Sequence, residues 1–313
     1  MAPVRAGAFN SPFWVQAQRE AAPEHQALLR QTQDLVASGR AASTRNKYGP
    51  AWEAFELWCR QAGYCALPAK DVHVAMYLTQ LALSAAGYAV VKMASAAIFA
   101  VHEEACAGAN PTQSKVCAGV RQGALRALGA RAKNRKSPLA VAQLVSVVSL
   151  LAPPDAPLWA VMIATMASVS FAGFLRYSDV AQVLRQDVRF FEGYVAVFLA
   201  KRKNDQFREG NVVLLARGST IACPVRLLER LLAMREWKAS EPLFQGFDGN
   251  AARRSRSVTQ LSGAPIEYGQ ARYYILKFVA KALGTSMEEA KARFGLHSLR
   301  SGGATAAAAA KGV

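Results

Sequence analysis

Three short stretches in the second half of the sequence carry side chains that can bind a phosphate and move protons around it. These side chains are Arg176 in the stretch 174–179, Lys203 in 201–206, and His297 and Arg300 in 297–303. Guanidinium groups bind phosphate oxygens through paired, charge-assisted hydrogen bonds, and an imidazole exchanges protons near neutral pH. Each stretch alone is weak evidence, because helix-terminal arginines, lysine-rich turns and H-x-x-R pairs are common.

The spacing of His297 and Arg300 has a direct consequence if their segment is helical. Residues three apart lie on one face of a helix, so both side chains would converge on one phosphate. The other three histidines have no metal-ligand spacing, and the five cysteines include no C-x-x-C pair. We therefore expect no metal site and no cofactor, and we expect reduced thiols in an intracellular protein.

The charge balance indicates a polyanionic partner. The chain has 313 residues, with 38 Lys plus Arg against 21 Asp plus Glu, and a formal net charge of +17. Because 52% of the residues are hydrophobic and only 19% are charged, we expect a folded chain with buried cores. The longest apolar stretch, 158–175, is diluted by serine, threonine and glycine, so we expect a core helix and no membrane span.

Charge also divides the chain into two parts. No acidic residue occurs between Glu104 and Asp155, and the stretch 131–136 within this gap is rich in arginine and lysine and is followed by Ser-Pro. We place a domain boundary near residue 136.

The two parts differ in the secondary structure that we expect. The first part shows helical spacing, with an apolar stripe at Tyr48, Trp52, Phe55 and Cys59 and three further helical segments. The second part mixes helices with short β-rich runs that predict a hairpin with a charged tip. The expected helices are 141–151, 158–184, 224–235, 268–283 and an alanine-rich stretch from residue 297, and the expected strands are 194–199 and 212–215.

The order of the three chemical stretches resembles the tyrosine recombinase or phage-integrase family, and most closely the integrases of mobile elements. In 173–179 an acidic residue follows the arginine by three positions. The stretch 203–206 reads Lys-Asn-Asp-Gln and is similar to the family's K-T-x-Q hairpin. The stretch 297–305, His-Ser-Leu-Arg-Ser-Gly-Gly-Ala-Thr, is the best match. The stretch 43–48 and the helices after it look like the family's core-binding domain, so the resemblance covers most of the chain.

This resemblance implies a two-domain clamp that is mainly α with a small antiparallel β-sheet. Its parts would be an N-terminal extension (1–40), a helical, SAM-like core-binding domain (41–130), a basic linker (131–137) and an integrase-like catalytic domain (138–313). The implied partner is double-stranded DNA, with a possible homo-oligomer on the DNA and no membrane. The implied compartment is the nucleus in a eukaryote and the cytoplasm in a bacterium.

The resemblance also implies roles for the four side chains. Arg176 and Arg300 would clamp the non-bridging oxygens of a DNA phosphodiester while a side-chain nucleophile attacks it. Lys203 would be the general acid for the departing 5′ oxygen, and His297 would exchange a proton with the nucleophile.

Two assignments have alternatives. Lys201 is a second candidate for the hairpin acid, although Lys203 fits better because Asn-Asp-Gln follows it. Asp179 is either a carboxylate that orients the arginine or histidine groups or an ordinary surface acid.

Binding to DNA would rest mostly on neutralisation of phosphates, which is salt dependent and largely independent of sequence. The expected contacts are Arg45, Lys47, Lys92, Arg131, Lys133, Arg135 and Lys136. For each of these residues taken singly, a solvated surface charge is the favoured alternative.

The largest departure from the family concerns the nucleophile. In the family an attacking tyrosine follows the H-x-x-R motif, whereas all nine tyrosines of this sequence precede His297 and the sequence stops at Val313. Tyr273 and Tyr274 are expected to be core aromatics. We therefore expect a C-terminally truncated chain that binds DNA but forms no covalent 3′-phosphotyrosyl link alone.

Three hypotheses from different classes result. The chain is a strand-exchange enzyme or a piece of one, a non-catalytic DNA-binding protein derived from a recombinase, or a basic helical protein that binds RNA or an acidic partner. The reading frame beyond Val313 separates the first two, and a preference for duplex DNA over structured RNA excludes the third.

Overall fold

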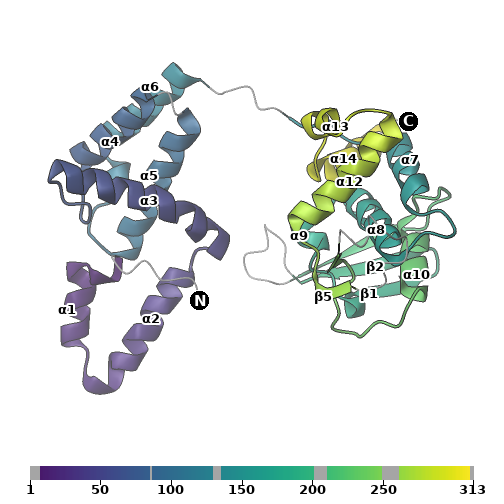
Figure 1. The fold of residues 1–313 in the computed structure, drawn as a ribbon. Helices are drawn as coiled ribbons and strands as arrows, with labels where there is room; N and C mark the ends of the chain where they lie inside the picture. Colours follow the sequence, from purple (N-terminus) through teal and green to yellow (C-terminus); the bar gives the residue numbers. More distant parts are fainter. Residues whose placement is uncertain (1–7, 85–86, 130–134, 201–209, 249–260, 311–313) are drawn as a thin grey trace. The chain divides into compact units, whose positions relative to one another are not determined.

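The computed structural model describes residues 8–84, 87–129, 135–200, 210–248 and 261–310. The chain divides into two compact units, Met1–Lys133 and Asn134–Val313 (Figure 1). Each unit buries its own set of apolar side chains, as a domain does.

The described part of the first unit is helical throughout. Its elements are α1 (Pro12–Glu20), α2 (Gln26–Ser38), α3 (Ala42–Ala62), α4 (Asp71–Leu83), α5 (Tyr88–Glu104) and α6 (Lys115–Leu128), with 3-10 turns at Ala8–Asn10, Pro23–His25 and Pro111–Gln113. The apolar stripe predicted along α3 is confirmed, because Trp52, Phe55 and Cys59 are buried. Pro50 lies inside α3 without delaying its start.

The N-terminal segment departs from the expectation of an extension over 1–40. Phe9 and Trp14 lie in the same core as the helices that follow. The Trp14 indole donates a hydrogen bond to the carbonyl of Glu104 at 2.9 Å, and Arg40 forms an ion pair with the Glu104 carboxylate at 3.1 Å. These contacts build the described part of the segment into the first unit, which sequence reasoning missed because the partners lie far apart in the chain.

The second unit combines helices with two small antiparallel sheets. Its elements are α7 (Val141–Leu151), α8 (Leu158–Ala172), α9 (Tyr177–Val180), a 3-10 turn (Arg185–Asp187), β1 (Val188–Phe191), β2 (Tyr194–Leu199), β3 (Asn211–Ala216), α10 (Pro224–Ala233), β4 (Gln245–Phe247), β5 (Leu261–Pro265), α12 (Tyr268–Leu283), α13 (Met287–Arg293) and α14 (His297–Ala310). The predicted hairpin is confirmed as β2–β3. The β4–β5 pair was not predicted, because its stretch shows little periodicity.

Helix α8 forms the centre of the second unit. It is apolar around its whole circumference and almost completely buried, which confirms the predicted core helix. Across the described ranges, no helix combines the length and apolar character that a membrane span requires. The helix predicted over 158–184 is wrong in its second half. It ends at Ala172, because Phe174 has a left-handed backbone (φ 51°) that a right-handed helix excludes.

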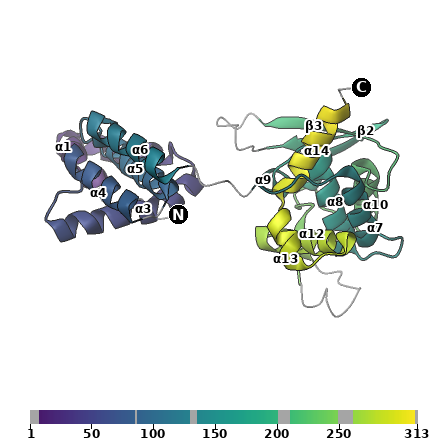
Figure 2. The ribbon, with the colours of Figure 1, turned by 90° about the horizontal axis from the view of Figure 1, so that it is seen from above.

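Strands β1, β2 and β3 form one antiparallel sheet in chain order. Val195 pairs with Leu215 and Val197 with Val188, and these buried side chains belong to the same core as α8. Figures 1 and 2 show α8 and α14 on one side of this sheet. The other side presents the alternate side chains, which include the exposed Phe198.

Candidate functional site

Arg176 lies in a tightly fixed turn at the end of α8. Phe174 turns the chain out of the helix, Leu175 is buried, and Arg176 is the half-buried N-cap residue that precedes α9. The backbone N–H of Arg176 donates to Oδ2 of Asp179 at 3.0 Å, and Ser178 Oγ donates to Oδ1 at 3.3 Å. The Asp179 carboxylate therefore binds both the Arg176 main chain and the Ser178 side chain.

Asp179 is only 3% exposed, so the alternative of an ordinary surface acid is wrong. Its carboxylate accepts the backbone amide of Arg176, and its own N–H donates to the Arg176 carbonyl at 3.0 Å. These reciprocal bonds close the first turn of α9. Asp179 thus fixes the backbone from which Arg176 extends.

His297 and Arg300 lie on the first turn of α14. His297 is exposed and Arg300 is half-buried. The start of the helix is held by the buried Ser298, whose Oγ accepts the N–H of Gly295 at 3.0 Å. The Ser298 carbonyl accepts the N–H of Leu139 at 2.9 Å, which ties α14 to the segment before α7.

The structure places the two arginine-bearing segments side by side. A Cβ atom added to Gly303 would lie 2.8 Å from Cδ1 of Phe174 and closer still to the carbonyl oxygen of Phe171. Gly303 is one helical turn beyond Arg300, and Phe174 is two residues before Arg176. Arg176 and the His297–Arg300 turn thus lie on adjoining segments.

The predicted hairpin lysines, Lys201 and Lys203, lie outside the described residues, and so do Arg131 and Lys133. The strands that flank the hairpin are described. A Cβ on Gly173 would meet a methyl of Leu215 at 3.2 Å, so β3 packs against the turn that leads to Arg176.

The remaining basic residues proposed for DNA contact differ in their surroundings. Lys47, Lys92 and Arg135 are exposed. The Arg45 guanidinium instead donates to the carbonyl of Ala37 at 3.0 Å.

Lys136 has a structural role that sequence reasoning missed. Its ammonium donates to the carbonyls of Lys291 at 2.7 Å and Ala292 at 2.8 Å, in the last turn of α13. A cation at this end of a helix satisfies free carbonyls and the helix dipole. Lys136 thus fastens the start of the second unit to the segment that precedes α14.

Three tyrosines of the second unit differ in their surroundings. Tyr274 is buried against Trp159, with ring centroids 5.2 Å apart, as predicted, whereas Tyr273 is 37% exposed and so departs from the expectation of a core aromatic. Burial raises the pKa of Tyr177, next to Arg176, and its hydroxyl donates to the carbonyl of Ile266. The Tyr177 hydroxyl is thus held as a neutral donor.

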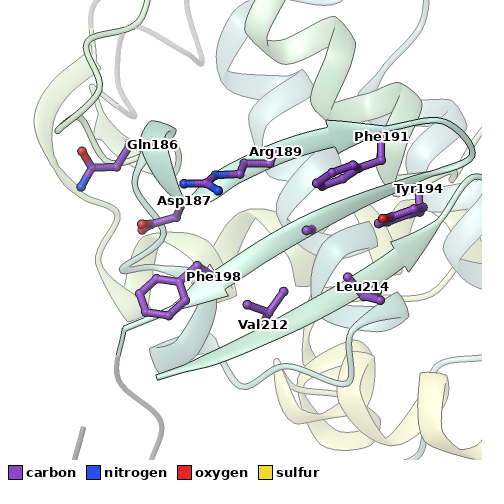
Figure 3. Close-up of a pocket in the computed structure, with 9 residues that line it drawn as sticks. Gln186, Asp187, Arg189, Phe191, Tyr194, Phe198, Val212 and Leu214 are labelled. Atoms are coloured by element: carbon purple, nitrogen blue, oxygen red, sulfur yellow. The ribbon is translucent and has the colours of Figure 1, made fainter. Parts of the chain in front are cut away.

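A hollow lies on the outer face of the β1–β3 sheet (Figure 3). Its lining is Gln186, Asp187, Arg189, Phe191, Tyr194, Ala196, Phe198, Val212 and Leu214. Among these, Asp187 accepts the backbone N–H of Leu184 at 2.9 Å. The lining is mostly apolar, and among its described residues the one cationic side chain is Arg189.

Comparisons with known proteins are consistent with the motifs. No family model matches the chain. An "Integrase/recombinase xerD homolog" of Selenomonas ruminantium is 26% identical over 269 residues, which are 86% of this chain and 74% of that protein. This similarity supports the tyrosine recombinase/integrase resemblance.

Among solved structures, a lambda integrase tetramer bound to a Holliday junction matches with a TM-score of 0.50, at 15% identity over 94% of this chain and 76% of that chain. A lambda integrase dimer bound to a COC' core site matches with a TM-score of 0.48, at 15% identity over 93% and 77%. The predicted fold class is confirmed: the chain forms two units that are mainly α with small antiparallel sheets, and its fold is similar to that of the lambda integrase tetramer structure.

Proposed function

We propose that this chain is a DNA-binding protein of the tyrosine recombinase/integrase type, and that its second unit holds one backbone phosphodiester at Arg176, His297 and Arg300. The observation that carries the proposal is the packing of Gly303, one turn after Arg300, against Phe174, two residues before Arg176. The recombinase relative, similar over most of both chains, supports it.

The chemistry of phosphodiester cleavage matches these groups. Attack on phosphorus places negative charge on the two non-bridging oxygens, and two guanidinium forks stabilise that charge by paired hydrogen bonds. We propose that the exposed imidazole of His297 exchanges a proton with the attacking hydroxyl. Lys203 is proposed as the acid that protonates the leaving 5′ oxygen, with Lys201 as its alternative.

Duplex DNA is the proposed partner. Lys47, Lys92 and Arg135 are the exposed cations that we assign to phosphate contacts. The solved relatives are described as lambda integrase on a core site and on a Holliday junction, and we propose that this chain likewise binds DNA, with assembly into oligomers on it. We also propose an origin in a mobile element.

For a polypeptide with this sequence alone, we propose DNA binding without covalent linkage. In the family the nucleophile follows the H-x-x-R motif, and no tyrosine of the sequence follows His297. A nicked duplex incubated with the purified chain and analysed on a denaturing gel tests this. A trapped protein–DNA adduct would contradict it.

The binding proposal is tested by measuring affinity for a short mixed-sequence duplex and for structured RNA over a range of salt. We expect preference for the duplex, a linear fall of log affinity with log salt, and weaker binding by Arg176→Ala and Arg300→Ala. Arg217→Ala is the control, because that exposed arginine is already paired with Glu229. Equal binding of RNA, or equal effects of all three variants, would argue against the proposal.

A further inference from the structure

Two consecutive glycines, Gly302 and Gly303, lie on α14 just after Arg300 and are both buried. A Cβ at Gly302 would come well within 3.0 Å of the carbonyl oxygen of Leu139, and one at Gly303 equally close to that of Phe171. Real Cβ atoms essentially never approach that closely. The backbone of α14 therefore rests directly on two main-chain carbonyls.

This contact leaves no room for adjustment by side-chain rotation. The hydrogen on each glycine Cα points at a carbonyl oxygen, which is the geometry of a weak Cα–H···O hydrogen bond. Other helical glycines differ, since Gly119 and Gly123 in α6 and Gly269 in α12 have nothing within 4 Å of an added Cβ. The close contact between helix backbone and carbonyl oxygens thus distinguishes α14 from these helices.

The two carbonyls belong to segments that lead to the proposed site. Phe171 is in the last turn of α8, five residues before Arg176, and the ring of Phe174 also meets Gly303. Leu139 contacts α14 twice, because its N–H donates to the Ser298 carbonyl while its own carbonyl lies under Gly302. The backbone contacts that hold α14 therefore also fix how far the Arg300 turn lies from the Arg176 turn.

We propose that Gly302 and Gly303 are positioning residues, which hold the His297–Arg300 turn at the separation from Arg176 at which both arginines bind one phosphate. The inference rests on the proposed function. Neither glycine touches the phosphate, so each acts through the arginine that it places.

Gly303→Ala is the direct variant. To restore ordinary contact, α14 must move away from α8 by roughly an ångström, because α8 lies in the packed core and cannot yield. In catalysis, a displacement of about 1 Å between groups that act together can lower the rate on the order of 100-fold. Gly302→Ala is the milder variant, because Leu139 lies in a non-helical segment that yields more easily than the end of α8.

The test is a double-mutant cycle on affinity for a short mixed-sequence duplex at fixed salt. In the native chain, Arg176 and Arg300 would bind the same phosphate. We therefore expect the Arg176→Ala/Arg300→Ala double variant to bind about tenfold more tightly than the two single effects predict by addition. In chains that also carry Gly303→Ala or Gly302→Ala, we expect this coupling to be lost and the two effects to become additive. Gly269→Ala, exposed in α12, is the matched control that keeps the coupling.

Circular dichroism and thermal unfolding establish that each variant is folded, and Gly302→Ala decides if Gly303→Ala does not fold. A purely structural role would lower stability and leave the coupling between the arginines intact in the folded fraction, so full coupling in a folded glycine variant overturns the inference. A native chain in which neither arginine substitution weakens binding overturns the proposed function instead, and the inference with it.

Discussion

The two arginine-bearing segments are held in contrasting ways. The turn at Arg176 is fixed by its own neighbours, since Asp179 bonds to the Arg176 amide and Phe174 supplies the left-handed residue. The turn at Arg300 has a local bond from the Gly295 N–H to Ser298, and it also depends on residues far earlier in the chain, since Leu139 and Phe171 supply the carbonyls on which α14 rests.

The contrast separates two ways of building one site. A turn closed by local hydrogen bonds keeps its shape when distant packing changes, because its contacts move with it. A helix seated on remote carbonyls keeps its position only while the core around it is intact. Changes at the Arg176 turn should therefore alter one local geometry, whereas changes around α14 should alter the distance between the two turns.

The largest effect is expected from Asp179→Ala. The substitution leaves the Arg176 N–H without its carboxylate acceptor and removes the first-turn carboxylate of α9, so we expect a loss of about 1–3 kcal/mol in the free energy of unfolding. Chemical denaturation monitored by circular dichroism measures it. Asp179→Asn keeps an oxygen acceptor at the same place and should lose less. Equal losses in the two variants would show that the amide bond does not hold the turn.

A somewhat smaller effect is expected from Ser298→Ala, which tests the other turn. The Gly295 N–H would lose its buried acceptor, at a cost of about 1–2 kcal/mol, and amide hydrogen exchange should accelerate at the start of α14. Ser301→Ala is the control, because that hydroxyl bonds only to carbonyls of its own helix, and we expect a change within about 0.5 kcal/mol. If Ser298→Ala accelerated amide exchange only at the Arg176 turn, the two turns would not be held independently.

The neighbours Arg135 and Lys136 distinguish DNA contact from structural support. Arg135 is exposed, so Arg135→Met should reduce the salt slope of duplex binding by about 1. The Lys136 ammonium is bound to the last turn of α13, so Lys136→Met should leave the slope unchanged and cost about 1 kcal/mol of stability. Fluorescence titration at several salt concentrations measures the slope. Equal changes in the salt slope for the two variants would show that Lys136 also contacts DNA.

The local features of this site could be predicted from the sequence. The acid three residues after Arg176 and the three-residue spacing of His297 and Arg300 are short-range patterns, and the apolar run of α8 predicts a buried helix. These signals need no knowledge of the rest of the fold, because helix geometry alone relates the residues.

The long-range features were not predictable in the same way. Nothing near Lys136 in the sequence indicates that its ammonium binds α13, and its position in a basic run favours a DNA contact instead. The end of α8 at Ala172 depends on the left-handed Phe174, a conformation that its residue type does not favour. The glycine pair at 302–303 is visible in the sequence, but the carbonyls that require it belong to Leu139 and Phe171, whose proximity only the fold supplies.

The smallest effect, and a sharp test of the local turn, concerns Phe174. Its φ of 51° is unfavourable for branched side chains and tolerated by asparagine, so Phe174→Val should be less stable than Phe174→Asn by about 1 kcal/mol. Hydrophobicity alone predicts the opposite order, because the 37% exposed site still contacts α14. Thermal unfolding of the two variants under one set of conditions decides between them. A more stable valine variant would mean that packing against Gly303, and not the backbone conformation at residue 174, dominates the stability of this turn.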